Sequence, residues 1–169
     1  MLHMLAQYLC MFALLTAMLT SCRSGSRWSL DRVESGSSAF NSTKLIFPAG
    51  DPIHGIDVEF LNTSKNLYVY LNVHSTPIPA LKDDPKHAFV ILTVGSEKHR
   101  FEAVRREGGQ RLLLPEEAVN LLIGSLQKDL PIEIKISGYS AQLTASDFSE
   151  KFKKMQQNPL FPNPFHLPF

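Results

Sequence analysis

The chain has 169 residues, of which 44% are hydrophobic, and this is enough to build one domain with a buried core. Its 17 Lys and Arg residues nearly balance its 16 Asp and Glu residues. Proteins that bind nucleic acid along their surface need a concentrated basic excess, so the composition excludes a nucleic-acid partner.

The first part of the chain is an apolar run, Leu9 to Leu19, followed closely by a cysteine. The run has the length of the hydrophobic region of a secretory signal. It ends in Leu19-Thr20-Ser21-Cys22, which is an aliphatic residue, two small residues and a cysteine. The other cysteine, Cys10, lies in the apolar run, so no disulfide is expected within the folded part of the chain.

This tetrapeptide resembles the lipobox of bacterial lipoproteins. The resemblance implies that residues 1–21 are a signal peptide, cut between Ser21 and Cys22, and that the Cys22 thiol takes a diacylglycerol. Membrane lipid is then one partner, and the domain lies outside the cytoplasm in the bacterial cell envelope. An Asp after the cysteine favours the inner membrane in some bacteria, whereas Arg23 stands here, so the outer membrane is slightly favoured.

Two alternatives stay open for the same segment. Residues Met1 to Met4 contain no Lys or Arg, although such signals usually begin with positive charge. An uncleaved membrane anchor is the first alternative, because the apolar run approaches the roughly 20 residues that a membrane helix needs. The second is a buried N-terminal helix of the domain, in which Cys22 is a packed thiol.

Residues 22–43 comprise Cys22 and a stretch rich in Ser and Gly, with scattered charges and no sustained periodicity. Such a composition cannot bury enough apolar surface to offset the loss of chain entropy. It predicts a flexible tether that lets the domain stand off the membrane. Trp28, within this stretch, is predicted either to lie at the level of the lipid headgroups or to dock on the domain.

Residues 44–157 are predicted to form a single β-rich α+β domain, with a mainly antiparallel sheet and two helices in its C-terminal half. In the clearest strand, Leu67, Val69, Leu71 and Val73 alternate with tyrosine or polar residues, so one face packs inward. The other predicted strands are residues 44–47, 56–60, 88–94, 99–104, 111–114, 131–136 and 141–143.

Two helices complete this domain. Pro115-Glu116-Glu117 indicates the start of the first, because proline and acidic residues favour a first helical turn. The second is predicted to run through Gln156, after a cap at Thr144 or Ser146. The predicted apolar faces consist of Ala118, Leu121, Leu122 and Leu126 in the first helix, and of Phe148, Phe152 and Met155 in the second.

The final segment, residues 158–169, is rich in Pro and Phe. Its prolines exclude a helix and favour an extended geometry. Phe161, Phe165 and Phe169 recur at every fourth position. They are predicted to cover a groove of their own domain or to stay disordered, and the alternative is that they offer an aromatic ligand to a partner.

Motifs that carry catalysis, phosphate binding or metal binding are absent from the sequence, so no cofactor and no metal are expected. His54 with Asp57 is the best local acid–base pair, and His74 on the outward strand face could join it. A solvated pair in a loop is the simpler interpretation. Asp83-Asp84, before Pro85, predicts a polar turn.

The sequence therefore predicts a lipid-anchored envelope protein that acts as a non-catalytic interaction or structural module for another envelope protein. Tyr68 and Tyr70, on the outward face of their strand, and the phenylalanines of the tail are the predicted contacts, because aromatic side chains often anchor interfaces. The alternatives are a small-ligand-binding lipoprotein with a deep apolar pocket and, less favoured, a hydrolase that uses His54 and Asp57.

Overall fold

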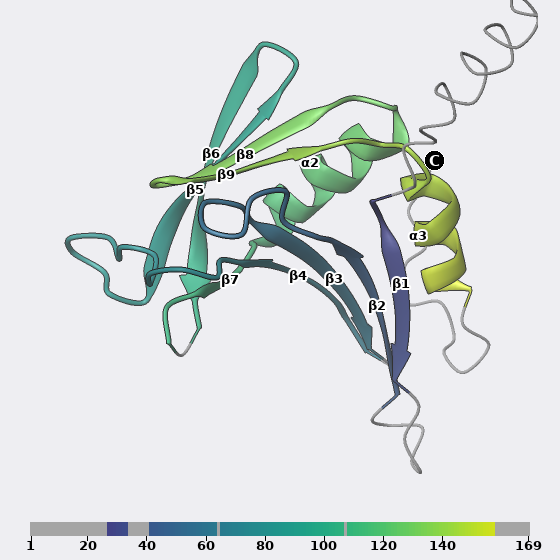
Figure 1. The fold of residues 1–169 in the computed structure, drawn as a ribbon, viewed down its shortest axis with the longest axis horizontal. Helices are drawn as coiled ribbons and strands as arrows, with labels where there is room; N and C mark the ends of the chain where they lie inside the picture. Colours follow the sequence, from purple (N-terminus) through teal and green to yellow (C-terminus); the bar gives the residue numbers. More distant parts are fainter. Residues whose placement is uncertain (1–26, 34–40, 64, 107, 158–169) are drawn as a thin grey trace, which may run out of the picture.

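The computed structural model describes residues 27–33, 41–63, 65–106 and 108–157, which form one sheet and two helices (Figure 1). In chain order the elements are β1 Ser29–Val33, β2 Ser42–Phe47, β3 Asp57–Thr63, β4 Leu67–Asn72, β5 His87–Val94, β6 Glu97–Arg105, β7 Arg111–Leu113, α2 Glu116–Gln127, β8 Ile132–Ile136, β9 Tyr139–Leu143 and α3 Phe148–Gln156.

The nine described strands pair antiparallel in the order β1-β2-β3-β4-β7-β6-β5-β8-β9. This confirms the predicted class, a β-rich α+β fold with two helices in the C-terminal half. Short turns set the local pairings. Gly95, with φ of 59°, allows the tight turn between β5 and β6. The pairing of β4 with β7 is a long-range contact, since residues 73–86 carry the chain from β4 past the positions of β7 and β6 to β5.

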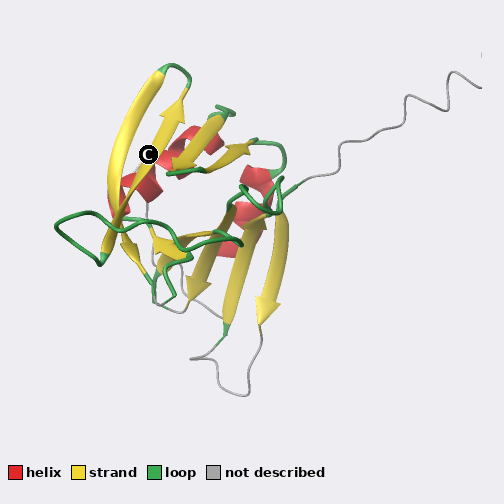
Figure 2. Ribbon diagram, turned by 60° about the vertical axis from the view of Figure 1, so that its left-hand side comes forward, coloured by secondary structure: helices red, strands yellow, loops and turns green. Residues whose placement is uncertain are grey.

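Both helices cover the inner face of the sheet: Figures 1 and 2 show α2 within the curve of the strands, and Figure 1 shows α3 beside β1. Helix α2 contacts β5, β8 and α3, while α3 contacts β1 and β2. The apolar faces are close to those predicted, because Ala118, Leu122 and Leu126 are buried in α2. Ile123 is buried there as well, whereas Leu121 is only half-buried. In α3 the buried residues are Phe148, Phe152 and Met155, as predicted.

The start of α3 differs from the prediction. The residue that precedes the helix is Asp147, not Thr144 or Ser146, and its side chain makes no capping hydrogen bond. Asp147 has φ of 60°, a left-handed conformation that Asp tolerates better than β-branched residues do. The chain therefore enters α3 through a sharp backbone turn, and Phe148 donates its N–H to the carbonyl of Ala145.

The predicted tether is wrong for residues 28–33. Trp28 is 1% exposed, and Ser29–Val33 forms strand β1, which pairs with β2 from Ser29↔Ile46 to Val33↔Ser42. Trp28 therefore docks on the domain, which was one of its two predicted positions. The folded part of the chain therefore includes Trp28 and does not begin at Lys44. Four of the five β1 side chains are exposed, and this explains its linker-like composition.

An aromatic cluster holds β1 in place. It consists of Trp28, Phe47, Phe60, Phe148 and Phe152. The Trp28 ring centre is 4.9 Å from those of Phe47 and Phe148, and 5.8 Å from that of Phe60. The Trp28 indole donates Nε1–H to the Thr144 carbonyl at 2.8 Å, so its polar group is satisfied. The cluster ties β1, β2 and β3 to α3.

Candidate functional site

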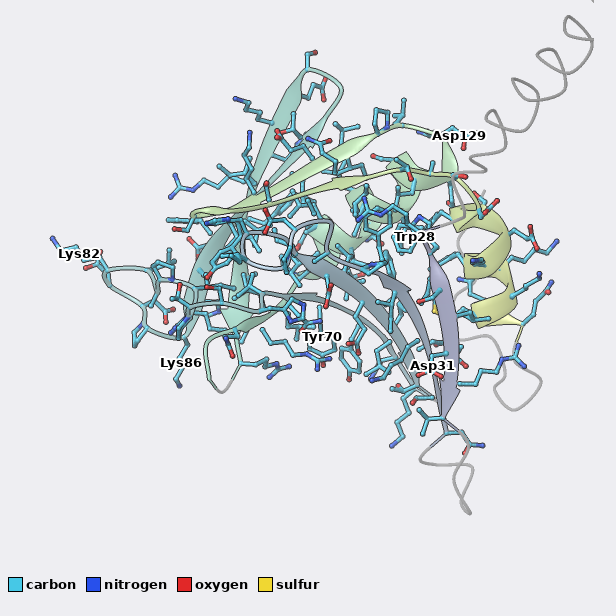
Figure 3. The ribbon with its side chains drawn as sticks, viewed as in Figure 1. Trp28, Asp31, Tyr70, Lys82, Lys86 and Asp129 are labelled. Atoms are coloured by element: carbon cyan, nitrogen blue, oxygen red, sulfur yellow. The ribbon has the colours of Figure 1, made fainter. Side chains whose placement is uncertain are left out.

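Charged and aromatic side chains gather on the outer face of the sheet, opposite the helices. We call this group the outer-face cluster; it consists of Lys44, Glu59, Tyr68, Tyr70 and Arg111. The residues come from β2, β3, β4 and β7, where they occupy positions that alternate with buried core residues. Figure 3 places Tyr70 and Trp28 on opposite sides of the sheet. The predicted outward orientation of Tyr68 and Tyr70 is therefore correct.

Glu59 is the buried centre of the outer-face cluster. It is only 8% exposed, and a charge in such a position must be paired. Its Oε1 accepts a hydrogen bond from Arg111 Nη2 at 3.1 Å and lies 3.7 Å from Lys44 Nζ. The two cations leave the group one positive charge in excess. Arg111 is positioned by the β4–β7 pairing, in which it lies opposite Asn72.

Arg111 also fixes the position of Tyr70. The guanidinium carbon Cζ lies 3.8 Å from the centre of the Tyr70 ring, within the range of a cation–π contact. The Tyr68 ring follows at 6.3 Å between ring centres, and Asn66 Nδ2 donates to its hydroxyl at 3.0 Å. Both rings are half-exposed. Aromatic groups held in this way lose little conformational entropy when a partner covers them.

An acid–base pair lies at one end of the same face. Asp57 Oδ2 is 2.6 Å from His74 Nε2, and Asp57 Oδ1 accepts the Ala49 N–H at 2.6 Å. The His74 side chain is 51% exposed. The predicted partner His54 does not join them, because its Nδ1 lies 3.9 Å from Asp51 Oδ2 in the neighbouring loop. Asp57 is thus paired with His74 and not with His54.

The His74 and Asp57 side chains form an acid–base pair of the kind that can activate a water molecule or a hydroxyl. In the part of the chain that the structure describes, no three His, Cys, Asp or Glu side chains group in a way that could hold a metal ion. Asp51 serves a turn instead, since the backbone N–H groups of His54 and Ile53 lower the pKa of its carboxyl.

Asp84 likewise organises a turn. Its Oδ1 accepts the Lys86 N–H at 2.9 Å, and its Oδ2 lies 2.6 Å from His87 Nδ1 at the start of β5. The predicted polar turn at Asp83-Asp84 is therefore correct for Asp84.

Asp84→Asn is expected to reduce the loss of stability that acid causes. The Lys86 N–H and then the His87 side chain hold the pKa of the Asp84 carboxyl below its ordinary value of 3.8. Because folding lowers this pKa, the carboxylate stabilises the native state fully above pH 3.8 and loses that effect as the pH falls through the lower folded-state pKa. Urea unfolding of both proteins across this range measures the difference, and an NMR titration that places the Asp84 pKa at or above 3.8 would contradict it.

Three residues of the outer-face cluster, Lys44, Glu59 and Arg111, were not among the predicted contacts. Their signal in the sequence is weak, because each occupies a position on the outward face of an alternating strand, as many ordinary charged residues do. What brings Arg111 to Glu59 is the pairing of β4 with β7, and hydropathy does not encode that pairing.

The remaining predicted site residues lie outside the described residues. These are Ser21, Cys22, Phe161, Phe165 and Phe169. Within the described ranges, no helix is both long and apolar enough to cross a membrane. Comparisons with protein-family models, with curated proteins and with solved structures give no match.

Proposed function

We propose that this chain is a lipid-anchored protein of the bacterial cell envelope, and that its domain binds another envelope protein without catalysis. Cys22 carries the lipid, and the outer-face cluster is the binding surface. The observation that carries the second part is the Tyr70–Arg111–Glu59 arrangement, in which a half-exposed ring is held 3.8 Å from a guanidinium that is itself paired with a buried carboxylate.

The residue types and the fixed positions of their side chains both support this surface. Tyrosine and arginine are enriched among the residues that dominate binding energy at protein interfaces. The excess positive charge next to two aromatic rings favours a partner segment with an acidic residue beside an apolar one. The strands beneath the cluster fix the positions of its side chains, so binding requires little reorganisation.

The small-ligand alternative receives less support. A ligand-binding lipoprotein would need an apolar cavity between sheet and helices. The aromatic cluster fills the part of that space beneath β1, β2 and β3, with ring centres 4.9 to 5.9 Å apart. The hydrolase alternative would now depend on Asp57 with His74, because His54 is paired elsewhere.

A photo-crosslinking amino acid at position 68, introduced in living cells, tests the proposed surface. We expect it to give one discrete adduct with an envelope protein, because the Tyr68 ring is half-exposed and lies next to Tyr70 on the proposed binding surface. The same amino acid at Gln142 is the matched control, since Gln142 is exposed on the edge strand β9 and does not belong to the outer-face cluster. Equal adducts at both positions, or none at position 68, would contradict the proposal.

The partner identified in this way then permits an affinity measurement. Tyr70→Ser is expected to weaken binding by about 2 kcal/mol, or about 30-fold, which is the effect of removing an interface hot spot. Tyr70 is half-exposed, so the variant is expected to keep its fold, and circular dichroism checks this.

A further inference from the structure

The segment between Cys22 and the folded part of the chain is much shorter than the predicted tether. Arg27 is already attached to the folded part, because its Nη2 donates to the Pro48 carbonyl at 3.0 Å and its Cζ lies 4.5 Å from the Phe47 ring centre. Four residues, 23–26, separate it from Cys22. Five Cα–Cα steps of at most about 3.6 Å give a maximum span of about 18 Å, whereas a tether reaching residue 43 would span up to about 75 Å.

One end of the domain is the end at which the N-terminal segment joins it. We call this the anchor end; it contains Arg27, Trp28, Thr144 and the turn Lys128–Leu130. Trp28 is hydrogen-bonded to the Thr144 carbonyl. Thr144 follows the last pair of the β8–β9 ladder, Ile132↔Leu143, so the turn before Ile132 lies at the same end. Figure 3 shows Trp28 and Asp129 together at this end and Lys82 at the opposite end of the domain.

The anchor end presents an apolar side chain in a fixed position. Leu130 is 40% exposed, and its N–H donates to the Ser125 carbonyl, while the Asp129 N–H donates to that of Leu126. These two bonds, with Asp129 at φ of 58°, form the Schellman motif that closes α2. The exposed charges of the anchor end, Arg27, Lys128 and Asp129, leave one positive charge in excess, so attraction to anionic lipid would add to this apolar contact.

We infer that the anchor end lies directly on the phospholipid headgroups of the membrane in which Cys22 is anchored, with Leu130 as an apolar contact. This inference rests on the proposed lipidation of Cys22. A chain limited to about 18 Å keeps the anchor end within that distance of the lipidated residue, whereas a tether reaching residue 43 would allow about 75 Å. The outer-face cluster is then presented beside the membrane surface, so it suits a partner that is itself embedded in or bound to that membrane.

Fluorescent labels on introduced cysteines test the inference. The chain has no cysteine after Cys22, so Leu130→Cys and Lys82→Cys each supply a single free thiol in the lipidated protein. The full-length variants are expressed in the bacterium, purified as lipidated proteins and placed in uncharged phosphatidylcholine vesicles that contain a headgroup-linked quencher. We expect loss of most of the fluorescence at position 130 and almost none at position 82.

A longer tether provides the matched control. An insertion of about 30 Gly and Ser residues between positions 26 and 27 has a root-mean-square span of about 30 Å, so quenching at position 130 is expected to disappear. Mass spectrometry of the same samples reports whether Cys22 is lipidated. Lipidated protein with equal quenching at both positions would overturn the inference and leave the anchor standing. Protein without lipid on Cys22 would overturn the anchor itself, and the inference with it.

Discussion

Trp28→Ala is expected to lower the free energy of unfolding by about 3–5 kcal/mol, the usual cost of truncating a large buried aromatic side chain. Trp28 contacts Phe47, Phe60 and Phe148, and its indole N–H is bonded to the Thr144 carbonyl. Alanine would leave a cavity between β1 and α3 and an unpaired carbonyl beside it. A domain of this size has a total stability of about 5–15 kcal/mol, so the loss would be a large fraction of it.

Urea unfolding followed by circular dichroism measures this effect in a soluble chain that starts at residue 23. Trp28 is the single tryptophan, so fluorescence cannot follow the alanine variant. Asp31→Ala is the matched control, because Asp31 lies on the same strand, is exposed, and is expected to change stability by less than about 0.5 kcal/mol. If the two variants had the same stability, β1 would not be an integral part of the domain.

The importance of Trp28 could not be predicted from hydropathy, and the reason is physical. Sequence periodicity reports which side chains are buried, and in β1 only Leu30 is even half-buried. The strand is held by backbone pairing with β2 and by the single tryptophan at its start. Neither backbone hydrogen bonds nor one isolated aromatic residue produce a periodic pattern, so the stretch has the composition of a linker.

The hairpin of β3 and β4 shows the opposite case. Val69, Leu71 and Val73 are buried on one side of the chain while Tyr68 and Tyr70 point to the other, as the alternation predicts. Position along a strand fixes the face, so the predicted outward tyrosines are found on the outer face. Alternation cannot, however, identify the neighbouring strand. The guanidinium on Tyr70 comes from β7, and only the pairing of β4 with β7 places it there.

The acid–base pair illustrates the same limit at short range. His54 is three positions from Asp57 in the sequence and His74 is seventeen, yet Asp57 pairs with His74. The β3–β4 hairpin places Asn72 directly opposite Asp57, and His74 lies two residues further along the same face. His54 lies in the loop before β3, where its backbone N–H donates to the Asp51 carboxylate. Proximity in the sequence therefore does not identify the histidine that pairs with Asp57.

Cys22→Ser is expected to abolish both lipid attachment and cleavage before residue 22. In the lipoprotein pattern the thiol is the group that accepts the diacylglycerol, and a serine hydroxyl is a much weaker nucleophile. Each buried methylene of an acyl chain contributes about 0.8 kcal/mol to membrane binding, so two or more long chains make the anchor effectively permanent. Metabolic labelling with an alkyne fatty acid should mark the wild-type protein and not the variant.

Mass spectrometry of the N-terminus separates this proposal from the two alternatives for the segment. A lipoprotein begins at a modified Cys22, and Cys22→Ser keeps Met1. An uncleaved anchor keeps Met1 in both proteins, which stay in the membrane fraction without lipid. A buried helix keeps Met1 in both and leaves both in the soluble fraction. Cys10→Ser is the matched control, because removing that thiol, which lies within the apolar run, is expected to change neither labelling nor cleavage. Lipid labelling that persists in Cys22→Ser would contradict the proposed anchor, because the lipid would then be attached to a residue other than Cys22.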